Sequence, residues 1–405
     1  MTRRRPILAV VSPFIDKSHG TERQVAEWTS QLLDDFEVHL YCQHVEDVDL
    51  EKLQWHRIPM FPGPHLVNFT WFFVANHLWR WWDRTFRGIS HDLVYTPGTN
   101  CLDADAISVH IVFAEFLRQM GSELDFSQNS ILSWPWLVHR RIYYQLIVYL
   151  ERRLYIDPRA QLVLYARKTE NDLNRFYGPH EPLPVVYIGV DHNAFNPQMR
   201  AARRSEARRE LGLAEETIAL LLVGNDWRKK GLFTLLDALA MLADLPTVLL
   251  VAGNDETHSY QSIIKKLGIS ERVRFLPPRS DVAYYYAAAD IYTGPSVEDT
   301  FALPPEEAMA CGLPVITTVT NGTSEIMTDR VDGFVLDDSS DVQELALRIR
   351  QLCENAELRR LMGDAAAQTA KKYTWENNGH QFRAIFAGIL RRKESSRATP
   401  IHQER

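Results

Sequence analysis

Cysteine is scarce in this 405-residue sequence. The four residues, Cys42, Cys101, Cys311 and Cys353, lie too far apart to form a metal-ligand pair or a dense disulfide framework. No run of about 18 uncharged apolar residues is present, so we expect no membrane span. Residues 1–6 are basic and lead straight into an apolar strand, without the long apolar segment and cleavage site of a signal peptide. Together these absences predict a protein of the reducing cytosol.

An excess of positive charge is also missing. The 45 basic and 52 acidic residues give a formal net charge of −7, the wrong sign for a general nucleic-acid binder. None of the 19 glycines lies in a Gly-x-Gly, and the sequence has no Gly-Lys-Ser/Thr phosphate loop and no Gly-x-Ser-x-Gly elbow. Dinucleotide binding, phosphate-loop chemistry and the hydrolase nucleophile are therefore not expected.

What is present is a long globular chain, 45% hydrophobic and 24% charged, which predicts two or three domains. Short apolar runs alternate with amphipathic stretches, the pattern of parallel sheets covered on both faces. One series of predicted strands comprises residues 7–11, 38–41, 93–95, 106–109 and 162–165, and a second comprises 218–223, 248–252, 273–276, 291–292, 315–317 and 334–336. The expected fold class is α/β, with two Rossmann-like doubly wound domains facing each other across a cleft.

The hinge between the two series is expected within residues 189–215, where Asn196-Pro197 precedes a charged stretch. This predicts an N-terminal domain over 1–190 and a C-terminal domain over 191–375, followed by a polar, flexible tail over 395–405. Ligands of such sheets bind beyond the carboxyl ends of the strands, so functional residues are expected in the strand-to-helix loops.

The most informative segment spans residues 295–315 and reads as a strand end, an acidic loop, a helix and a Gly-Leu-Pro-Val turn. Pro304 and Pro305 suit the first turn of a helix, whose free N–H groups and dipole make an anion site. Nearby carboxylates suit sugar hydroxyls. An ordinary acidic helix cap is an equally good interpretation of this segment alone.

This segment resembles the retaining glycosyltransferases of the two-Rossmann (GT-B) type, family four. Their hallmark is an acidic residue, seven residues, then Glu-Ala-Met-Ala and a Gly-x-Pro-Val turn, which aligns Asp299 and Glu307 with the two acids. A literal Glu-x7-Glu spacing selects Glu298 and Glu306 instead. We prefer the first alignment because a slip of one residue rotates a helical side chain by about 100 degrees.

The resemblance implies that the first acid contacts the donor sugar, the second contacts the ribose, and the amides of Phe301, Ala302 and Leu303 face the diphosphate or sugar. Asp299 stands where the family usually has Glu, so Glu298 remains an alternative for that role.

Further matches run along the chain in the family's order. Lys230 occupies the family's phosphate-binding lysine position, whereas Asn225 replaces its arginine and leaves Arg228 or Lys229 as the second cation. Leu276 is predicted to line the donor site. Residues 187–195 are similar to the segment that enters the second domain. Residues 373–375 resemble the closing segment before a helix, 376–394, that returns to the first domain.

Two predicted contacts come from the first domain. His19-Gly20-Thr21-Glu22 resembles the family's Gly-Gly-x-Glu loop, and Gly20 would let the backbone approach the donor diphosphate. His110 follows a predicted strand, where the family has a histidine that contacts the donor sugar. Taken without the family, a buried hydrogen-bonded histidine is the commoner explanation of His110.

The resemblance therefore implies transfer of a sugar from a nucleoside diphosphate donor, with UDP favoured, to an acceptor hydroxyl with retention of configuration. No cofactor and no metal are expected, and the pairs Asp47/Asp49 and Asp103/Asp105 are interpreted as surface coincidences. The predicted partners are the donor and a glycan or lipid-linked acceptor, as in cell-envelope glycan, glycolipid or polysaccharide synthesis. A sugar-nucleotide epimerase and a non-catalytic sugar-nucleotide-binding protein stay open as alternatives.

Two aromatic segments, residues 69–86 and 134–155, are suited to helices at a membrane surface or lipid acceptor. Helices that pack only on the first domain or on a partner subunit are the alternative. The predicted location is cytoplasmic, with peripheral contact at the inner face of the membrane left open.

Overall fold

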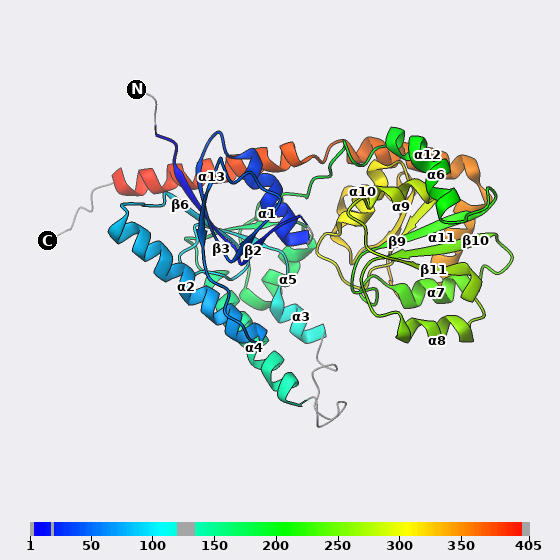
Figure 1. The fold of residues 1–405 in the computed structure, drawn as a ribbon, viewed down its shortest axis with the longest axis horizontal. Coiled ribbons are helices and arrows are strands. Elements are labelled where there is room, and N and C mark those ends of the chain that lie inside the picture. The colour runs from blue at the N-terminus through cyan, green and yellow to red at the C-terminus, as the bar shows by residue number, and fades with distance from the viewer. Residues whose placement is uncertain (1–3, 18–19, 120–133, 399–405) are drawn as a thin grey trace. The chain divides into compact units, whose positions relative to one another are not determined.

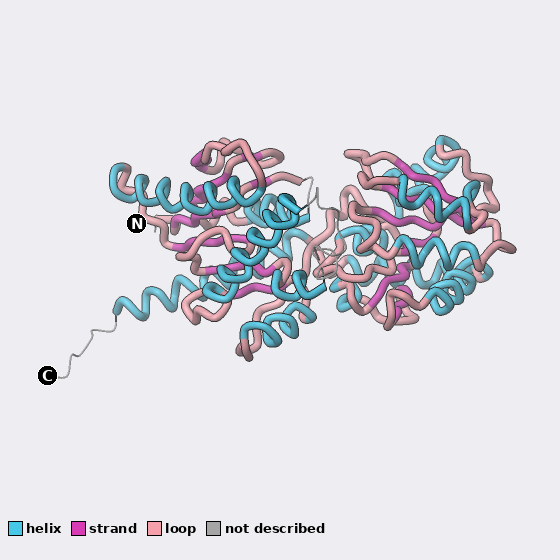
Figure 2. The backbone as a smooth tube through the Cα atoms, turned by 90° about the horizontal axis from the view of Figure 1, so that it is seen from below, coloured by secondary structure: helices cyan, strands magenta, loops and turns pink. Residues whose placement is uncertain are grey.

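The computed structural model describes residues 4–17, 20–119 and 134–398. The chain forms two compact units, one made of residues 1–187 and 375–405, the other of residues 188–374. Each unit contains a six-stranded sheet covered by helices on both faces (Figures 1 and 2). The predicted division of the chain, at 190 and 375, differs from the observed one by three residues and by one residue.

The first unit holds a parallel sheet of order β5-β3-β1-β6-β7-β8 and a small parallel pair, β2-β4. Its strands are β1 (Ile7–Val11), β2 (Phe14–Ile15), β3 (Glu37–Cys42), β4 (His44–Val45), β5 (Gln54–Arg57), β6 (Leu93–Pro97), β7 (Ala106–Val109) and β8 (Gln161–Leu164). Its helices are α1 (Gly20–Gln31), α2 (His65–Phe86), α3 (Phe113–Gln119), α4 (Trp134–Leu154), α5 (Lys168–Tyr177) and α13 (Trp375–Ala398).

Aromatic packing ties α1 and α13 to one face of this sheet. The Trp28 ring of α1 stacks on Phe382 of α13 at 4.9 Å and meets Tyr95 of β6 edge-on at 4.7 Å. The opposite face packs against α2, α4 and α5 through buried side chains such as Phe72 and Leu173. Both faces of the strands are thus covered, which explains why β1 reads as an unbroken apolar run.

The second unit repeats the design with a parallel sheet of order β11-β10-β9-β12-β13-β14. Its strands are β9 (Ile218–Val223), β10 (Thr247–Ala252), β11 (Val273–Leu276), β12 (Ile291–Thr293), β13 (Val315–Thr318) and β14 (Gly333–Leu336). Its helices are α6 (Pro197–Glu210), α7 (Leu232–Ala240), α8 (His258–Lys266), α9 (Ala283–Ala288), α10 (Leu303–Ala310), α11 (Val342–Glu354) and α12 (Ala356–Ala370), with short 3₁₀ turns η3 (Ser270–Arg272) and η4 (Gly322–Ile326).

In both sheets the chain order reverses beside the first strand of the unit, between β1 and β6 and between β9 and β12. Loops that leave the carboxyl ends of strands on either side of such a reversal diverge, and the space between them is where doubly wound sheets bind ligands. The loops after β9 and β12 therefore border the expected ligand site of the second unit.

The prediction that the charged stretch after Asn196-Pro197 belongs to a hinge is wrong. It forms α6, in which the Asn196 side chain caps the helix by accepting from the Met199 N–H. Buried Arg208 donates to Asp290 at 3.0 Å, which fixes the helix to the body of the second unit. The C-terminal helix also continues to Ala398, four residues beyond its predicted end.

Asp103 lies at the surface, as predicted, with 57% of its side chain exposed, whereas Asp105 is largely buried; both carboxylates have partners within the first unit. Asp103 accepts from both terminal nitrogens of Arg80 at 2.7 Å, and Asp105 accepts from Val94 N–H and from Lys393, each at 2.8 Å. Among the described residues, no group of three or more His, Cys, Asp or Glu side chains is arranged to hold a metal ion. No described helix is long and apolar enough to cross a membrane.

Candidate active site

An ion pair links the two loops beside the chain reversal of the second sheet. The Lys230 Nζ, in the loop after β9, donates to the Asp299 carboxylate, in the loop after β12. Both side chains are largely but not fully buried, with 16% and 19% of their surface exposed. The structure thus brings together a cation and an acid that sequence analysis assigned to donor binding, although they lie 69 residues apart in the chain.

Close backbone approach sets the position of Lys230. Gly231 has φ +80°, and a Cβ there would lie 2.0 Å from the carbonyl oxygen of Pro295. The backbone N–H of Val297 donates to the Lys229 carbonyl at 2.7 Å, which joins the same two loops. Only glycine at position 231 allows the loops to meet this closely, so the placement of Lys230 follows from the backbone.

The loop that carries Asp299 is fastened to the segment after β13. The Asp299 N–H donates to the Thr320 carbonyl at 3.1 Å, and its carbonyl accepts from Gly322 N–H at 3.0 Å. The buried Asn321 side chain accepts from the N–H groups of Ala302 and Thr323, at 3.3 and 3.1 Å. The Ala302 amide, predicted to face the donor, is therefore engaged by Asn321 in this structure. Sequence analysis missed Asn321; the signal was a polar residue before Gly322 at a strand end.

Helix α10 begins with Leu303 and carries Pro304 and Pro305 in its first turn. Glu307 is buried, and its Oε2 accepts from the hydroxyl of Tyr286 at 2.8 Å. Burial, followed by the negative charges of Asp299 and Glu307, raises the pKa of Tyr292 far above its usual value. The two acids of the preferred alignment thus both act on one buried phenol, in the middle of β12.

The other residues predicted in this loop take different positions. Phe301 is buried, while Glu298 and Leu303 are partly exposed. Glu306, the partner of Glu298 in the alternative alignment, is fully buried in α10. Glu307, its counterpart in the preferred alignment, is buried as well, so burial does not separate these two acids, whereas Asp299 is 19% exposed.

Three further predicted residues come from the loop after β9 and from β11. Arg228 and Asn225 are exposed in the loop after β9, and partly buried Leu276 ends β11. The Asn225 side chain accepts from Asn254 N–H at 2.8 Å and so joins this loop to the loop after β10. In this structure Asn225 therefore holds two loops in place.

In the first unit the structure brings the start of α1 and the end of β7 together. The Thr21 hydroxyl lies 3.3 Å from His110 Nδ1, and Ser108 Oγ lies 3.1 Å from His110 Nε2. The ring of His110 packs 4.5 Å from that of Tyr165. Burial lowers the pKa of His110 to about 3, so the imidazole is neutral at physiological pH. It can exchange hydrogen bonds with a sugar hydroxyl but carries no charge to a phosphate.

Gly20 is the first residue of α1, and a Cβ there would have nothing within 4 Å. Its amide lies at the N-terminus of α1, where an anion is favoured. The next residue, Thr21, is the one that contacts His110. His19, which was predicted to precede it in this loop, lies outside the described residues. Thr21, Ser108 and Tyr165 were not singled out from the sequence.

Comparison with known proteins identifies the second unit. Residues 203–369, which hold Lys230, Asp299 and Glu307, match the family model described as glycosyl transferases group 1. The chain carries a glycosyl transferases group 1 domain. A D-inositol 3-phosphate glycosyltransferase of Corynebacterium urealyticum is 30% identical over 247 residues, which cover 58% of each chain.

A D-inositol 3-phosphate glycosyltransferase of Thermobifida fusca is 34% identical over 248 residues, which cover 58% of this chain and 54% of the relative. The chain thus spans somewhat more than half the length of these curated relatives.

Solved structures show the fold over nearly the whole chain. WaaG, a glycosyltransferase involved in lipopolysaccharide biosynthesis, is similar with a TM-score of 0.76 and 21% identity over 94% of this chain and 99% of that one. Sucrose-phosphate synthase from Thermosynechococcus elongatus has a TM-score of 0.75 and 17% identity over 96% and 99%. The predicted two-Rossmann, GT-B fold is thereby confirmed.

Proposed function

We propose that this group 1 protein is a retaining glycosyltransferase that moves a sugar from a nucleoside diphosphate to an acceptor hydroxyl. The observation that carries the proposal is the Lys230–Asp299 ion pair, which lies beside the chain reversal of a group 1 domain. A cation is available there for the leaving diphosphate, and a carboxylate for the hydroxyls of the departing sugar. Both groups are held by backbone contacts before any donor arrives.

The proposed chemistry uses positive charge to stabilise the diphosphate as the glycosidic bond breaks. Lys230 and Arg228 supply the cations, and the N-terminus of α10 adds the positive end of its dipole. The acceptor attacks the oxocarbenium-like centre from the face that the diphosphate leaves, and a phosphate oxygen takes the proton of the acceptor. This scheme needs no enzymic nucleophile and no metal ion. For His110 and Gly20 we retain the roles that the resemblance implies, contact with the donor sugar and the diphosphate.

We favour UDP as the nucleotide. A protein of similar fold, Anabaena Alr3699/HepE, has been solved with UDP and glucose, with a TM-score of 0.65 and 19% identity. The names of the curated relatives add a phosphorylated inositol to the acceptors that merit testing.

An acceptor of the cell envelope suits the exterior of α2 and α4. On α2, Trp81, Trp82 and Phe86 are 57%, 51% and 60% exposed, and on α4 Trp136 is 55% exposed. The two helices lie side by side, with the rings of Phe69 and Tyr143 5.6 Å apart. Exposed aromatic rings beside arginines match the headgroup level of a membrane, so we propose peripheral contact through this surface.

The test is a screen of UDP-, GDP- and ADP-sugars for binding by calorimetry and for slow hydrolysis without acceptor. Lys230→Ala should weaken binding of the preferred donor by roughly 10- to 100-fold, because charge-assisted hydrogen bonds are worth about 1.5–3 kcal/mol. Lys265→Ala, on the exposed face of α8, is the matched control and should bind normally.

Failure of every donor to bind would refute the proposal. Unchanged donor binding and turnover after Glu307→Ala would refute the assignment of that residue. Activity that disappears with EDTA and returns with a divalent cation would refute the metal-independent scheme.

A further inference from the structure

A chain of three hydroxyl groups and one imidazole runs through the first unit. The Tyr95 hydroxyl of β6 lies 2.6 Å from Ser108 Oγ of β7, and Ser108 Oγ lies 3.1 Å from His110 Nε2. On the other side of the ring, His110 Nδ1 lies 3.3 Å from the Thr21 hydroxyl at the start of α1. Ser108 and His110 are two residues apart at the end of a strand, so their side chains lie on the same side of the sheet. The strand thus places a hydroxyl directly behind the imidazole.

The inner part of this chain is closed to bulk solvent. Tyr95 and Ser108 have no exposed surface, whereas the side chain of His110 is partly exposed. Among the residues that the structure describes, Ser108 Oγ is the hydrogen-bond partner of the Tyr95 hydroxyl. The neighbouring hydroxyl of Tyr165 forms no hydrogen bond within the described part of the chain. A buried hydrogen without an acceptor is costly, so each hydrogen of the chain should point at the next atom in it.

The number of hydrogens fixes their directions. Tyr95 has one hydroxyl hydrogen and finds its acceptor in Ser108 Oγ, so Tyr95 donates to Ser108. The single hydroxyl hydrogen of Ser108 is then directed to His110 Nε2, which must be an acceptor. Burial lowers the pKa of His110 to about 3, so the ring is neutral at physiological pH and has one hydrogen on its nitrogens. That hydrogen therefore lies on Nδ1.

The Nδ1 nitrogen faces a weaker partner than Nε2 does. Its distance of 3.3 Å from the Thr21 hydroxyl exceeds the usual N–H···O range of roughly 2.7–3.2 Å. Thr21 is itself partly exposed in the first turn of α1, so water can satisfy its hydroxyl. An oxygen of a ligand can therefore replace Thr21 at Nδ1 without leaving a buried group unpaired.

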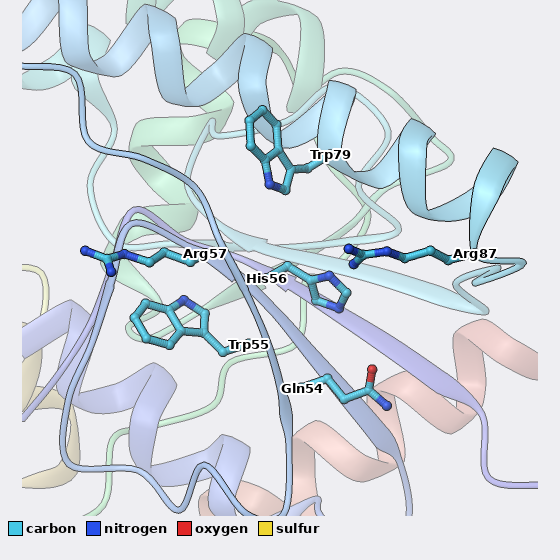
Figure 3. A pocket seen from close by; sticks show the side chains of 6 residues that line it. All are labelled: Gln54, Trp55, His56, Arg57, Trp79 and Arg87. Atoms are coloured by element: carbon cyan, nitrogen blue, oxygen red, sulfur yellow. The ribbon is translucent and has the colours of Figure 1, made fainter.

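Another histidine of the same unit, His56, differs in this respect. It lines a polar cavity of about 420 Å³ together with other side chains of β5 and α2 (Figure 3). Its Nδ1 lies 2.7 Å from a carboxylate oxygen of Asp83, and its Nε2 lies 2.9 Å from Nδ1 of His39. Buried groups engage both nitrogens of His56 but only one nitrogen of His110. Of the two rings, His110 is the one that can donate to a ligand.

We propose that Tyr95 and Ser108 are positioning residues, which hold His110 as the Nδ1–H tautomer so that it donates a hydrogen bond to a hydroxyl oxygen of the donor sugar. The ligand in this inference rests on the proposed function, whereas the tautomer follows from contacts within the first unit alone. The opposite tautomer would present a lone pair at Nδ1 and would require the sugar hydroxyl to donate instead.

The first test is nitrogen-15 NMR of the full chain with labelled histidine at pH 7. A ring nitrogen that carries a hydrogen and one that does not have well-separated shifts, so the spectrum reports the tautomer. The resonances of His110, assigned by their loss in His110→Gln, should show a hydrogen on Nδ1 and none on Nε2. A parent spectrum with the hydrogen on Nε2 would overturn the proposal.

Variants separate the positioning contacts from general packing. Ser108→Ala should give a mixture of tautomers, because no hydroxyl then donates to Nε2, and Ser108→Thr should restore the Nδ1–H form. Tyr95→Phe should also admit the Nε2–H form, since Ser108 can then accept from the ring. Tyr165→Phe is the matched control: it keeps a ring 4.5 Å from that of His110 and removes a hydroxyl that has no partner among the described residues. An unchanged tautomer in both Ser108→Ala and Tyr95→Phe, or equal changes in Tyr95→Phe and Tyr165→Phe, would contradict the assigned roles.

Donor binding supplies the second measurement, by calorimetric titration with UDP-glucose and with UDP. Ser108→Ala should weaken UDP-glucose by roughly two- to tenfold, as expected for loss of one neutral hydrogen bond, and should leave UDP unchanged. Equal losses for the two ligands would refute a sugar contact that depends on the tautomer of His110. Failure of the parent to bind UDP-glucose would overturn the ligand proposed for His110 and count against the proposed function, whereas the spectrum alone decides the tautomer.

Discussion

Replacing Gly231 by alanine should both destabilise the second unit and disturb the candidate site. Gly231 has φ +80° and precedes α7, and its absent Cβ would lie 2.0 Å from the carbonyl oxygen of Pro295 and 2.7 Å from the carbonyl carbon. Pro295 lies four residues before Asp299, on the same loop. An alanine can fit only if this loop moves away from Lys230.

The cost has two parts. A left-handed backbone conformation costs a non-glycine residue about 1–2 kcal/mol. Relief of the overlap with Pro295 by backbone movement adds about 1–3 kcal/mol, the usual range for overpacking. We therefore expect Gly231→Ala to lower the free energy of unfolding by about 2–5 kcal/mol, measured by urea denaturation as a lower midpoint at unchanged slope.

Gly268→Ala is the matched control. Gly268 also has a left-handed backbone, with φ +70°, but a Cβ there would meet nothing within 4 Å. It should lose only about 1 kcal/mol, because strain is partly offset by the reduced freedom of the unfolded chain. Equal losses in the two variants would show that the close approach of Gly231 to Pro295 does not hold the loops together. Donor binding should fall in Gly231→Ala and stay unchanged in Gly268→Ala.

Three further predictions concern buried charge. Asp290→Asn should cost about 3–5 kcal/mol in urea denaturation, because it leaves buried Arg208 and its neighbour Arg204 without their carboxylate. Burial raises the pKa of the Glu151 carboxyl to about 7 in the folded protein. The stabilisation from its protonated form is therefore present below the usual pKa of glutamate and is lost as the pH rises through 7. The stability of the parent relative to Glu151→Gln should accordingly fall from pH 5 to 8. Burial lowers the pKa of His110 to about 3, so the stabilisation from its neutral ring is present above about pH 6.5 and is lost on acidification toward pH 3. The stability of the parent relative to His110→Gln should therefore fall from pH 6.5 to 4. An equal pH dependence of stability in the two proteins would contradict the lowered pKa.

Most strands of the two sheets could be predicted closely because their apolar runs are bounded by helical periodicity. β9 and β11 have the predicted limits, since their apolar runs end where the chain leaves the sheet. The outer strand β5 was missed because Gln54-Trp-His-Arg57 is exposed on one side and lacks an apolar run. Helix α6 was missed for a related reason: its cohesion comes from ion pairs to Asp290, which hydrophobic periodicity does not register.

The candidate site could be predicted only where a residue type was tied to a motif. Lys230 and Asp299 were found in this way, whereas Asn321 was not, because its role is to satisfy backbone N–H groups of a neighbouring loop. Thr21 was passed over for the same reason: its contact with His110 joins segments 89 residues apart. Contacts of this kind depend on strand order, which local patterns do not record.

The two acids of the preferred alignment differ in their exposure and in their partners within the second unit. Asp299 is partly exposed and shares its charge with Lys230, while buried Glu307 is held by the hydroxyl of Tyr286. Both carboxylates raise the pKa of Tyr292, which ends up neutral between them and can pass a hydrogen bond without carrying charge. An acid at the surface of the site can rearrange when a diphosphate competes for Lys230, whereas one fixed in α10 cannot. If the proposed donor binds here, we expect Asp299 to be the acid that moves and Glu307 to be the acid that stays in place.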